Sequence, residues 1–129
     1  MVWNTLLQFT LRTEGTLTAA VVICTRYRPE FLRDCLNGVA RLDPSPDEVI
    51  VVDNTVGDRE TASAAREFGA QYLIEPAPGL SRARNRALRE SRSEILAYLD
   101  DDAVPDQRWL QRILDPFADP HVAIVTGLV

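Results

Sequence analysis

The 129-residue sequence contains no lysine, so all 14 of its basic residues are arginines. This composition indicates codon bias in a GC-rich genome, and it excludes every mechanism that requires a lysine side chain. Histidine is almost as scarce, since His121 is the only one. It follows Asp119-Pro120 at the start of an expected strand. A Ser-His-Asp triad needs a histidine in a different setting. We therefore interpret His121 as structural.

Cysteines and long apolar segments are also few. Cys24 and Cys35 form no CxxC pair and have apolar neighbours, which indicates free buried thiols in a reducing compartment. No apolar segment approaches the ~20 residues that a membrane span needs. Residues 1–16 lack the basic region and the apolar core of a signal peptide. We expect a cytoplasmic protein without a transmembrane segment, for which peripheral association with the inner face of the membrane is a further option.

Size and charge indicate one domain and restrict its partners. Hydrophobic residues make up 46% and charged residues 26% of the chain, which suits a single core. The formal net charge of −5 argues against a nucleic-acid-binding surface. We expect an N-terminal extension over residues 1–18 and a single domain over residues 19–129.

Short apolar segments alternate with helical patterns along this domain. Strands are expected at 19–24, 48–53, 70–74 and 94–99, with a fifth beginning at Val122–Val125. Helices are expected from Pro29 onward and at 59–68, 81–92 and 106–118. This alternation is typical of a Rossmann-like α/β fold, with a parallel sheet, helices on both faces and right-handed crossovers. Ligands of such sheets bind beyond the carboxyl ends of the strands.

Three consecutive carboxylates, Asp100, Asp101 and Asp102, directly follow the expected strand at 94–99. Each one raises the cost of ionising its neighbours. Because side chains alternate along an extended segment, we expect Asp100 and Asp102 on one side and Asp101 on the other. Two hard oxygen ligands suit Mg²⁺ or Mn²⁺, which take only one or two protein carboxylates when phosphates complete the shell. The segment therefore predicts a divalent-metal site.

The helix expected at 81–92 places a positive charge where an anion is favoured. Its predicted apolar face consists of Leu80, Ala83, Ala87 and Leu88, and the opposite, solvated face carries Arg82, Arg86 and Arg89. Arg84 falls within the apolar sector, in the first turn, and a helix N-terminus attracts anions. We interpret Arg84 as an anion-binding residue. The alternative is a snorkelling arginine paired with an acid such as Glu75.

Four segments, in this order and spacing, resemble a family 2 glycosyltransferase of the GT-A fold: AVVICTRYRPEFLRDCLNGV, EVIVVDNT, GLSRARNRAL and ILAYLDDDAVPD. The resemblance covers residues 19–129 and implies a parallel sheet in the strand order 3-2-1-4. It also implies a nucleotide-diphosphate-sugar donor, with a UDP-sugar as the first choice. The acceptor hydroxyl, on a saccharide, a lipid or another molecule, is not specified by it.

The resemblance also implies roles for individual residues. The nucleotide-binding residues that it implies are Thr25, Tyr27, Asp53, Arg84, Asn85, Asp100 and Asp101. It implies Asp102, together with Asp100, as ligands of Mn²⁺ or Mg²⁺. Such a metal would bridge the donor phosphates and stabilise the departing nucleoside diphosphate.

Two features depart from the family pattern. The second expected strand ends in Asp53-Asn54, where the family commonly has two acids, so the ribose contacts are less well defined. The chain also ends after the fifth expected strand, whereas family members continue through an acceptor-binding half that supplies a catalytic base. The inverting transfer typical of the family needs that base. We therefore expect a truncated, donor-binding portion that is inactive by itself.

Three other functions deserve comparison. A non-catalytic nucleotide-sugar-binding module stays open, because no catalytic base is assigned. A haloacid-dehalogenase-type phosphatase is suggested by residues 100–104, which fit D-x-D-x-[TV], but that family carries the motif after its first strand and needs a later lysine. A two-component receiver domain also needs a lysine, and it needs acids after its first strand, where Cys24-Thr25-Arg26 has none.

Overall fold

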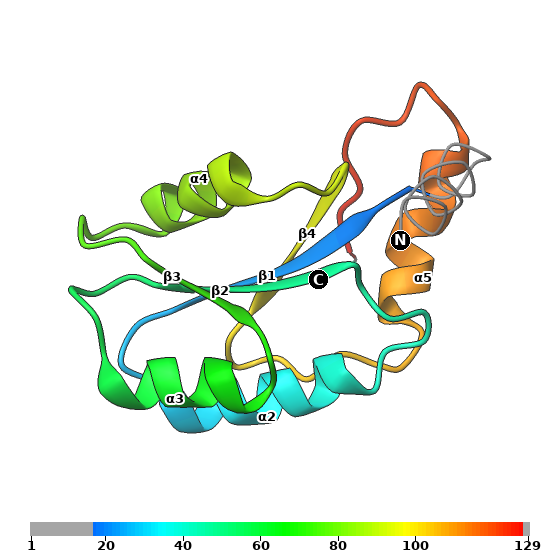
Figure 1. Cartoon of the computed structure of the whole chain (residues 1–129). Helices are drawn as coiled ribbons and strands as arrows, with labels where there is room; N and C mark the ends of the chain where they lie inside the picture. The colour runs from blue at the N-terminus through cyan, green and yellow to red at the C-terminus, as the bar shows by residue number, and fades with distance from the viewer. Residues whose placement is uncertain (1–16, 128–129) are drawn as a thin grey trace, which may run out of the picture.

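The computed structural model describes residues 17–127, whose strands form one four-stranded parallel sheet in the order β3-β2-β1-β4 (Figure 1). The strands are β1 (Ala19–Thr25), β2 (Glu48–Asp53), β3 (Gln71–Ile74) and β4 (Ile95–Asp100). The helices are α2 (Pro29–Ala40), α3 (Arg59–Glu67), α4 (Leu80–Glu90) and α5 (Trp109–Leu114), which the 3-10 helix η1 (Asp115–Ala118) continues. The predicted fold class and strand order are therefore confirmed.

β1 lies between β2 and β4 and pairs with both of them along its length. Val22 lies opposite Ile50 of β2 and Tyr98 of β4. At the carboxyl end, Thr25 pairs with Asp53 and Cys24 pairs with Asp100. The polar strand ends therefore meet at one edge of the sheet, as the sequence predicts.

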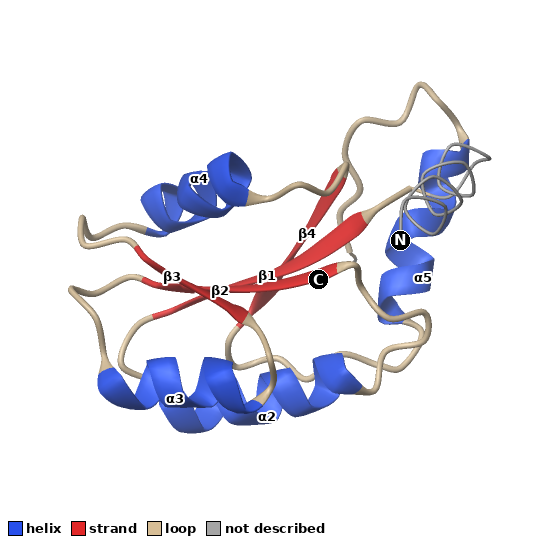
Figure 2. Cartoon of the chain, viewed as in Figure 1, coloured by secondary structure: helices blue, strands red, loops and turns tan. Residues whose placement is uncertain are grey.

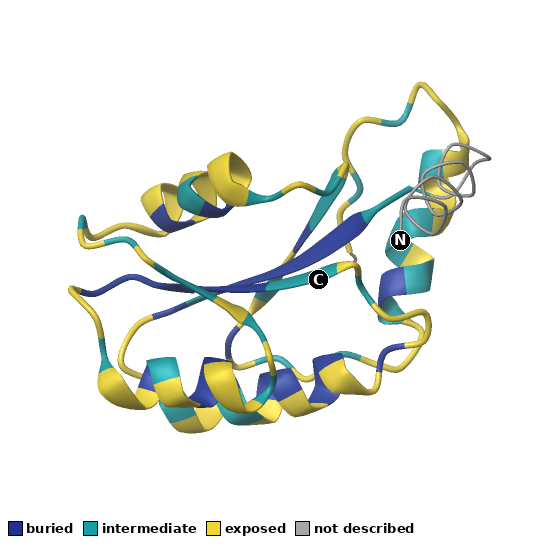
Figure 3. Cartoon of the chain, viewed as in Figure 1, coloured by how far each residue is buried: buried dark blue, intermediate teal, exposed yellow. Residues whose placement is uncertain are grey.

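Helices cover both faces of the sheet (Figure 2). Alternate side chains of β1 face opposite sides, and Val21 and Ile23 join the core formed with α2, α3 and Leu110 of α5. On the other face, Val22 packs with β2 residues and with Ala83 and Ala87 of α4. Figure 3 shows β1 as the most completely buried element, flanked by helices that are exposed on their outer sides. None of the described helices is long and apolar enough to span a membrane.

Local sequence accounts for the helix ends. Pro29 occupies the first turn of α2, where its missing N–H costs nothing. Asp58 precedes α3 and accepts a hydrogen bond from the Thr61 amide at 2.9 Å. Gly79 precedes α4 with φ of 134°, a conformation that L side chains rarely adopt. A glycine is therefore required at the point where the loop after β3 turns into α4.

Two predicted elements differ from the structure. Residues 122–127 form no strand, although a strand was predicted to begin at Val122–Val125. A strand needs a partner for its backbone hydrogen bonds, and within residues 17–127 the sheet consists of β1 to β4 without this segment. The helix predicted at 106–118 is shorter, because α5 begins at Trp109 and passes into η1 at Asp115.

The predicted apolar face of α4 is only partly correct. Ala83 and Ala87 are buried, whereas Leu80 and Leu88 are 52% and 60% exposed and Arg86 is half-buried. The cause is the position of the helix over β1 and β2, which turns the Arg86 side of α4 toward the sheet. Helical periodicity identifies the stripe of small residues, but the tilt of the helix against the sheet decides which neighbours of that stripe are covered.

Candidate functional site

A cavity of about 480 Å³ opens at the carboxyl ends of β1, β2 and β4, where the strand order predicts a ligand site. Its lining comes from the end of β1 and the following loop, from the residue after β2, from the start of α4 and from the acids at the end of β4. The lining residues are Cys24, Thr25, Arg26, Arg28, Asn54, Gly79, Leu80, Ala83, Asp100, Asp101 and Asp102. Of the predicted site residues, Thr25 and the three acids line this cavity.

Asp101 differs in burial from Asp100 and Asp102, although the extended backbone that the prediction assumed ends at Asp100. β4 ends at Asp100, and Asp101 and Asp102 form a turn, so the alternation of an extended strand stops there. Asp101 is 7% exposed and accepts a hydrogen bond from the Thr25 hydroxyl at 2.8 Å. Asp100 and Asp102 are exposed. Asp101 therefore borders the same cavity as its neighbours and connects the end of β1 to the turn after β4.

Arg28 neutralises part of this acidic turn. Its Nη1 lies 3.4 Å from Asp101 Oδ1, and its Nη2 lies 3.2 Å from Asp102 Oδ2. The guanidinium also stacks over the Phe31 ring, 4.8 Å from the centroid. Arg28 was not among the predicted nucleotide or metal ligands. Its position directly before the helix-opening Pro29, at the edge where the acids gather, was the available signal.

Asn54 is a second cavity residue that was not among the predicted nucleotide or metal ligands. Its Nδ2 donates to the carbonyl oxygens of Glu75 and Ala77, both at 2.8 Å, and its Oδ1 accepts from the Gly79 amide at 3.0 Å. Its own carbonyl oxygen accepts a hydrogen bond from Arg26 Nη1 at 3.2 Å. One buried amide thus fastens the loop between β3 and α4 to the cavity.

Asp53 reaches the strand end but does not line the cavity. The residue is fully buried, and its carboxylate accepts hydrogen bonds from the Thr55 hydroxyl at 2.7 Å and the Asp58 amide at 2.8 Å. The Tyr72 hydroxyl is a third donor to it. Burial, together with this hydrogen bond to Asp53, raises the pKa of Tyr72 above its usual value. The observed contacts of Asp53 therefore position the loop that leads into α3.

Tyr27 lies at the rim of the site rather than in its lining. Its side chain is 60% exposed, and the Arg26 guanidinium lies 5.7 Å from the ring centroid. Its φ of 53° is unusual for a residue other than glycine. This backbone conformation directs the chain from β1 toward Pro29.

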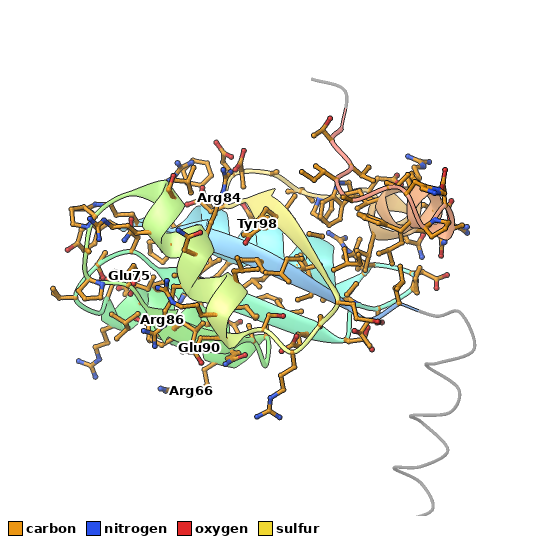
Figure 4. All side chains as sticks on the ribbon, turned by 90° about the horizontal axis from the view of Figure 1, so that it is seen from above. Arg66, Glu75, Arg84, Arg86, Glu90 and Tyr98 are labelled. Carbon is orange, nitrogen blue, oxygen red and sulfur yellow. The ribbon has the colours of Figure 1, made fainter. Side chains whose placement is uncertain are left out.

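Arg84 lies on the side of α4 that faces β4 (Figure 4). Its guanidinium is 5.6 Å from the centroid of the Tyr98 ring, and the Tyr98 hydroxyl donates to the Arg84 carbonyl oxygen at 3.1 Å. Glu75, the alternative partner, accepts instead from the Ala77 amide at 3.1 Å, and no described ion pair joins it to Arg84. Asn85 is exposed. Neither Arg84 nor Asn85 lines the 480 Å³ cavity.

The side chains at the cavity suit a hard cation better than a soft one. Within residues 17–127, no three His, Cys, Asp or Glu side chains converge as a preformed metal cluster. A cation held by one or two carboxylates and by phosphates does not need such a cluster. Asp100 and Asp102 offer exposed oxygen donors. Burial raises the pKa of the Cys24 thiol to about 11, so this cavity residue is a neutral thiol at neutral pH.

The parallel sheet in the order β3-β2-β1-β4, with a cavity and acids at its carboxyl edge, is the arrangement of a Rossmann-like α/β ligand-binding domain. Residues 20–129 match the family described as glycosyl transferase family 2, and the chain belongs to that family. It is 36% identical to glycosyltransferase AglE of Haloferax volcanii over 118 residues, which cover 85% of this chain and 38% of that protein.

Two solved structures share the fold. Mannosyltransferase PcManGT from Pyrobaculum calidifontis, in complex with GDP-Man and Mn²⁺, aligns with a TM-score of 0.73 at 25% identity, over 90% of this chain and 41% of that one. Glucosyl-3-phosphoglycerate synthase from Mycobacterium tuberculosis, in complex with Mn²⁺, UDP and glucosyl-3-phosphoglycerate, aligns with a TM-score of 0.68 at 21% identity, over 82% and 41%. The chain thus spans about two-fifths of the length of these relatives.

Proposed function

We propose that this chain is the donor-binding part of a glycosyltransferase that transfers a sugar from a nucleotide-diphosphate sugar to an acceptor hydroxyl. The observation that supports this function is the cavity at the carboxyl edge of the sheet, with Asp100, Asp101 and Asp102 at its mouth, in a chain of glycosyl transferase family 2. Exposed acids beside a cavity of this size fit a ligand that brings both a cation and phosphates.

In this proposal Asp102, with Asp100, holds Mn²⁺ or Mg²⁺, as their exposure at the cavity permits. A metal held by these residues would supply stabilisation of the negative charge on the departing nucleoside diphosphate. Asp101 stays bonded to Thr25, and this contact holds the turn in the orientation in which its neighbours reach the ligand. PcManGT, with its bound Mn²⁺ and GDP-Man, supports the same use of metal and nucleotide here.

The nucleoside end of the donor is proposed to lie toward β1 and β2. Thr25 lines the cavity there, and Tyr27 offers an exposed ring at its rim for stacking. Asp53 supports this end through the loop that it holds, and a direct contact with the base would require it to exchange one of its present donors. Arg84 and Asn85, both exposed on α4, are proposed to approach the donor from the side of β4.

The catalytic base is proposed to lie outside this chain. An inverting displacement requires a carboxylate that deprotonates the acceptor hydroxyl, and the acids at the cavity are engaged in the metal and donor roles above. By itself the chain is then a donor-binding module. The phosphatase alternative is unsupported, since the acids follow β4 rather than β1 and the sequence has no lysine.

Calorimetric titration of the chain with UDP and with GDP, in Mn²⁺ and in excess chelator, tests this function. We expect at least one of the two nucleotides to bind in Mn²⁺ and to lose all measurable affinity in chelator. A labelled donor incubated with the chain should be bound without being transferred. Binding that persists in chelator, or no binding of either nucleotide in Mn²⁺, would contradict the proposed function.

A further inference from the structure

The Arg28 side chain occupies the place beside the acidic turn that a cation would take. Its two terminal nitrogens lie 3.4 and 3.2 Å from carboxylate oxygens of Asp101 and Asp102, and it lines the cavity. A divalent metal on Asp102 and a guanidinium on the same carboxylate repel each other. Arg28 would therefore compete with a metal for Asp102.

The two acids differ in how easily they exchange this partner. The Asp101 side chain is only 8% exposed, and its other oxygen already accepts from Thr25 at 2.8 Å. The Asp102 side chain is 53% exposed, and Arg28 is its only ion-pair partner among the described residues. Exposed ion pairs contribute little to stability, so exchange at Asp102 is inexpensive. Asp102 is the carboxylate that yields to a metal.

The Arg28 guanidinium keeps two contacts when its ion pair with Asp102 is broken. It stacks on Phe31 in the first turn of α2, at 4.8 Å from the ring centroid, and its contact with Asp101 does not depend on Asp102. From the cavity wall its planar fork can donate two parallel hydrogen bonds to a phosphate. A diphosphate would therefore supply the negative charge that Arg28 loses when Asp102 binds metal.

We propose that Arg28 is the counter-ion of the acidic turn in the nucleotide-free protein and moves to the diphosphate when metal and nucleotide bind. This inference rests on the proposed function and deepens it. Its consequence is energetic coupling. Metal alone competes with Arg28 for Asp102, and nucleotide alone draws Arg28 away and leaves the acids without a counter-ion. Each ligand therefore raises the affinity for the other by the same factor. Mn²⁺ should thus bind the free protein weakly and the nucleotide-saturated protein tightly.

The test measures Mn²⁺ binding directly, from the electron paramagnetic resonance signal of free Mn²⁺. Titrations are made without nucleotide and with saturating UDP or, in parallel, GDP, on wild type, Arg28→Gln and Arg33→Gln. Arg33 is a matched control on α2, whose Nε lies 3.4 Å from Glu67 of α3. Arg28→Lys is a second variant that retains the charge but loses the fork, should Arg28→Gln fold poorly.

We expect Arg28→Gln to bind Mn²⁺ alone about three- to fivefold more tightly, as loss of an exposed like charge predicts. The factor by which nucleotide raises its Mn²⁺ affinity should fall about tenfold or more, because the diphosphate loses a charged partner. Arg28→Lys should lie between wild type and Arg28→Gln, and Arg33→Gln should match wild type. Coupled binding in wild type with an unchanged or weaker Mn²⁺ affinity in Arg28→Gln overturns this inference alone. Absence of coupled binding in wild type overturns the proposed function as well.

Discussion

The two ends of the sheet carry cavities of nearly equal size, about 480 Å³ at the carboxyl edge and 470 Å³ at the amino edge, and acids line both. They differ in what those acids contact. At the amino edge, the Glu48 carboxylate accepts hydrogen bonds from the Ser91 hydroxyl at 2.8 Å, from the Ser93 hydroxyl and from the Arg92 amide. The Asp47 carboxylate accepts from the Ala19 amide at 2.8 Å. These two carboxylates therefore satisfy hydrogen-bond donors at the start of β1 and in the loop between α4 and β4.

At the carboxyl edge, the exposed acids are left for other partners. Within residues 17–127 the Asp100 carboxylate makes no hydrogen bond or ion pair, and the Asp102 carboxylate forms an ion pair only with Arg28. A carboxylate that receives backbone and hydroxyl donors contributes to the fold, whereas one that lacks them is available to a ligand. The two cavities are alike in volume and in having acids in their lining. What distinguishes the proposed ligand-binding cavity is that its exposed acids lack backbone and hydroxyl donors from the protein.

The largest effect expected from this contrast is on nucleotide binding. Asp102→Asn removes a charge with little change in volume, and we expect it to weaken nucleotide binding in Mn²⁺ by about 1.5–3 kcal/mol, the usual cost of a lost charged contact. Stability should be unchanged or slightly higher, since repulsion within the turn falls. Asp101→Asn should cost less affinity. Calorimetry and urea unfolding measure the two quantities, and a larger affinity loss at Asp101 than at Asp102 would reverse the assigned roles.

A second effect should appear at Asn54, which occupies a position where the family commonly has an acid. Asn54→Asp would turn two donated hydrogen bonds, to the Glu75 and Ala77 carbonyls, into contacts between acceptors. We expect a loss of about 1–2 kcal/mol in unfolding free energy, together with weaker nucleotide binding as the loop before α4 loosens. Asn37→Asp, an exposed position on α2, is the matched control.

The pH dependence distinguishes loss of these hydrogen bonds from a general effect of charge. In the Asn54→Asp variant, the introduced carboxyl group can donate one of the two lost bonds when it is protonated, so the stability difference from wild type should shrink in acid. Urea unfolding at pH 7 and at about pH 4, near the usual pKa of such a group, measures it. Equal stability of Asn54→Asp and Asn37→Asp at pH 7 would show that the amide does not hold the loop.

Much of the carboxyl edge was predictable from local patterns, and the remainder of the contrast was not. The strand order, the location of the cavity and the acids after β4 follow from short apolar segments and from the resemblance to a known family. The pairing of Arg28 with Asp102 and the hydrogen bonds of Asn54 join residues far apart in the chain, which periodicity does not address. The burial of Asp101 depends on its hydrogen bond to Thr25 and on the turn that follows Asp100, neither of which strand alternation describes.

The smallest effect expected is at the amino edge, where Glu48→Gln should lower stability and leave nucleotide binding unchanged. Gln retains one oxygen acceptor but loses the charge that strengthens the bonds from Ser91, Ser93 and Arg92. We expect a loss of about 1 kcal/mol at pH 7, at the low end for charged hydrogen bonds because Glu48 is partly solvated. Nucleotide affinity measured on the same variant should equal that of wild type, which is the converse of Asp102→Asn.

The pH dependence of this loss follows from the pKa of Glu48. Burial opposes its ionisation, but hydrogen bonds from Ser93, Ser91 and the backbone lower its pKa below the usual 4.5. A carboxyl with a depressed folded-state pKa contributes stability above its unfolded pKa and loses it as the pH falls through the folded value. The difference between wild type and Glu48→Gln in urea unfolding should therefore be constant above about pH 5.5 and shrink below about pH 4.5. Glu60→Gln, at an exposed site on α3, controls for the loss of a surface charge. Two results would contradict this assignment: a stability difference between wild type and Glu48→Gln that grows in acid, or a loss of nucleotide affinity in Glu48→Gln. Either one would mean that the acids at the amino edge do not serve stability alone.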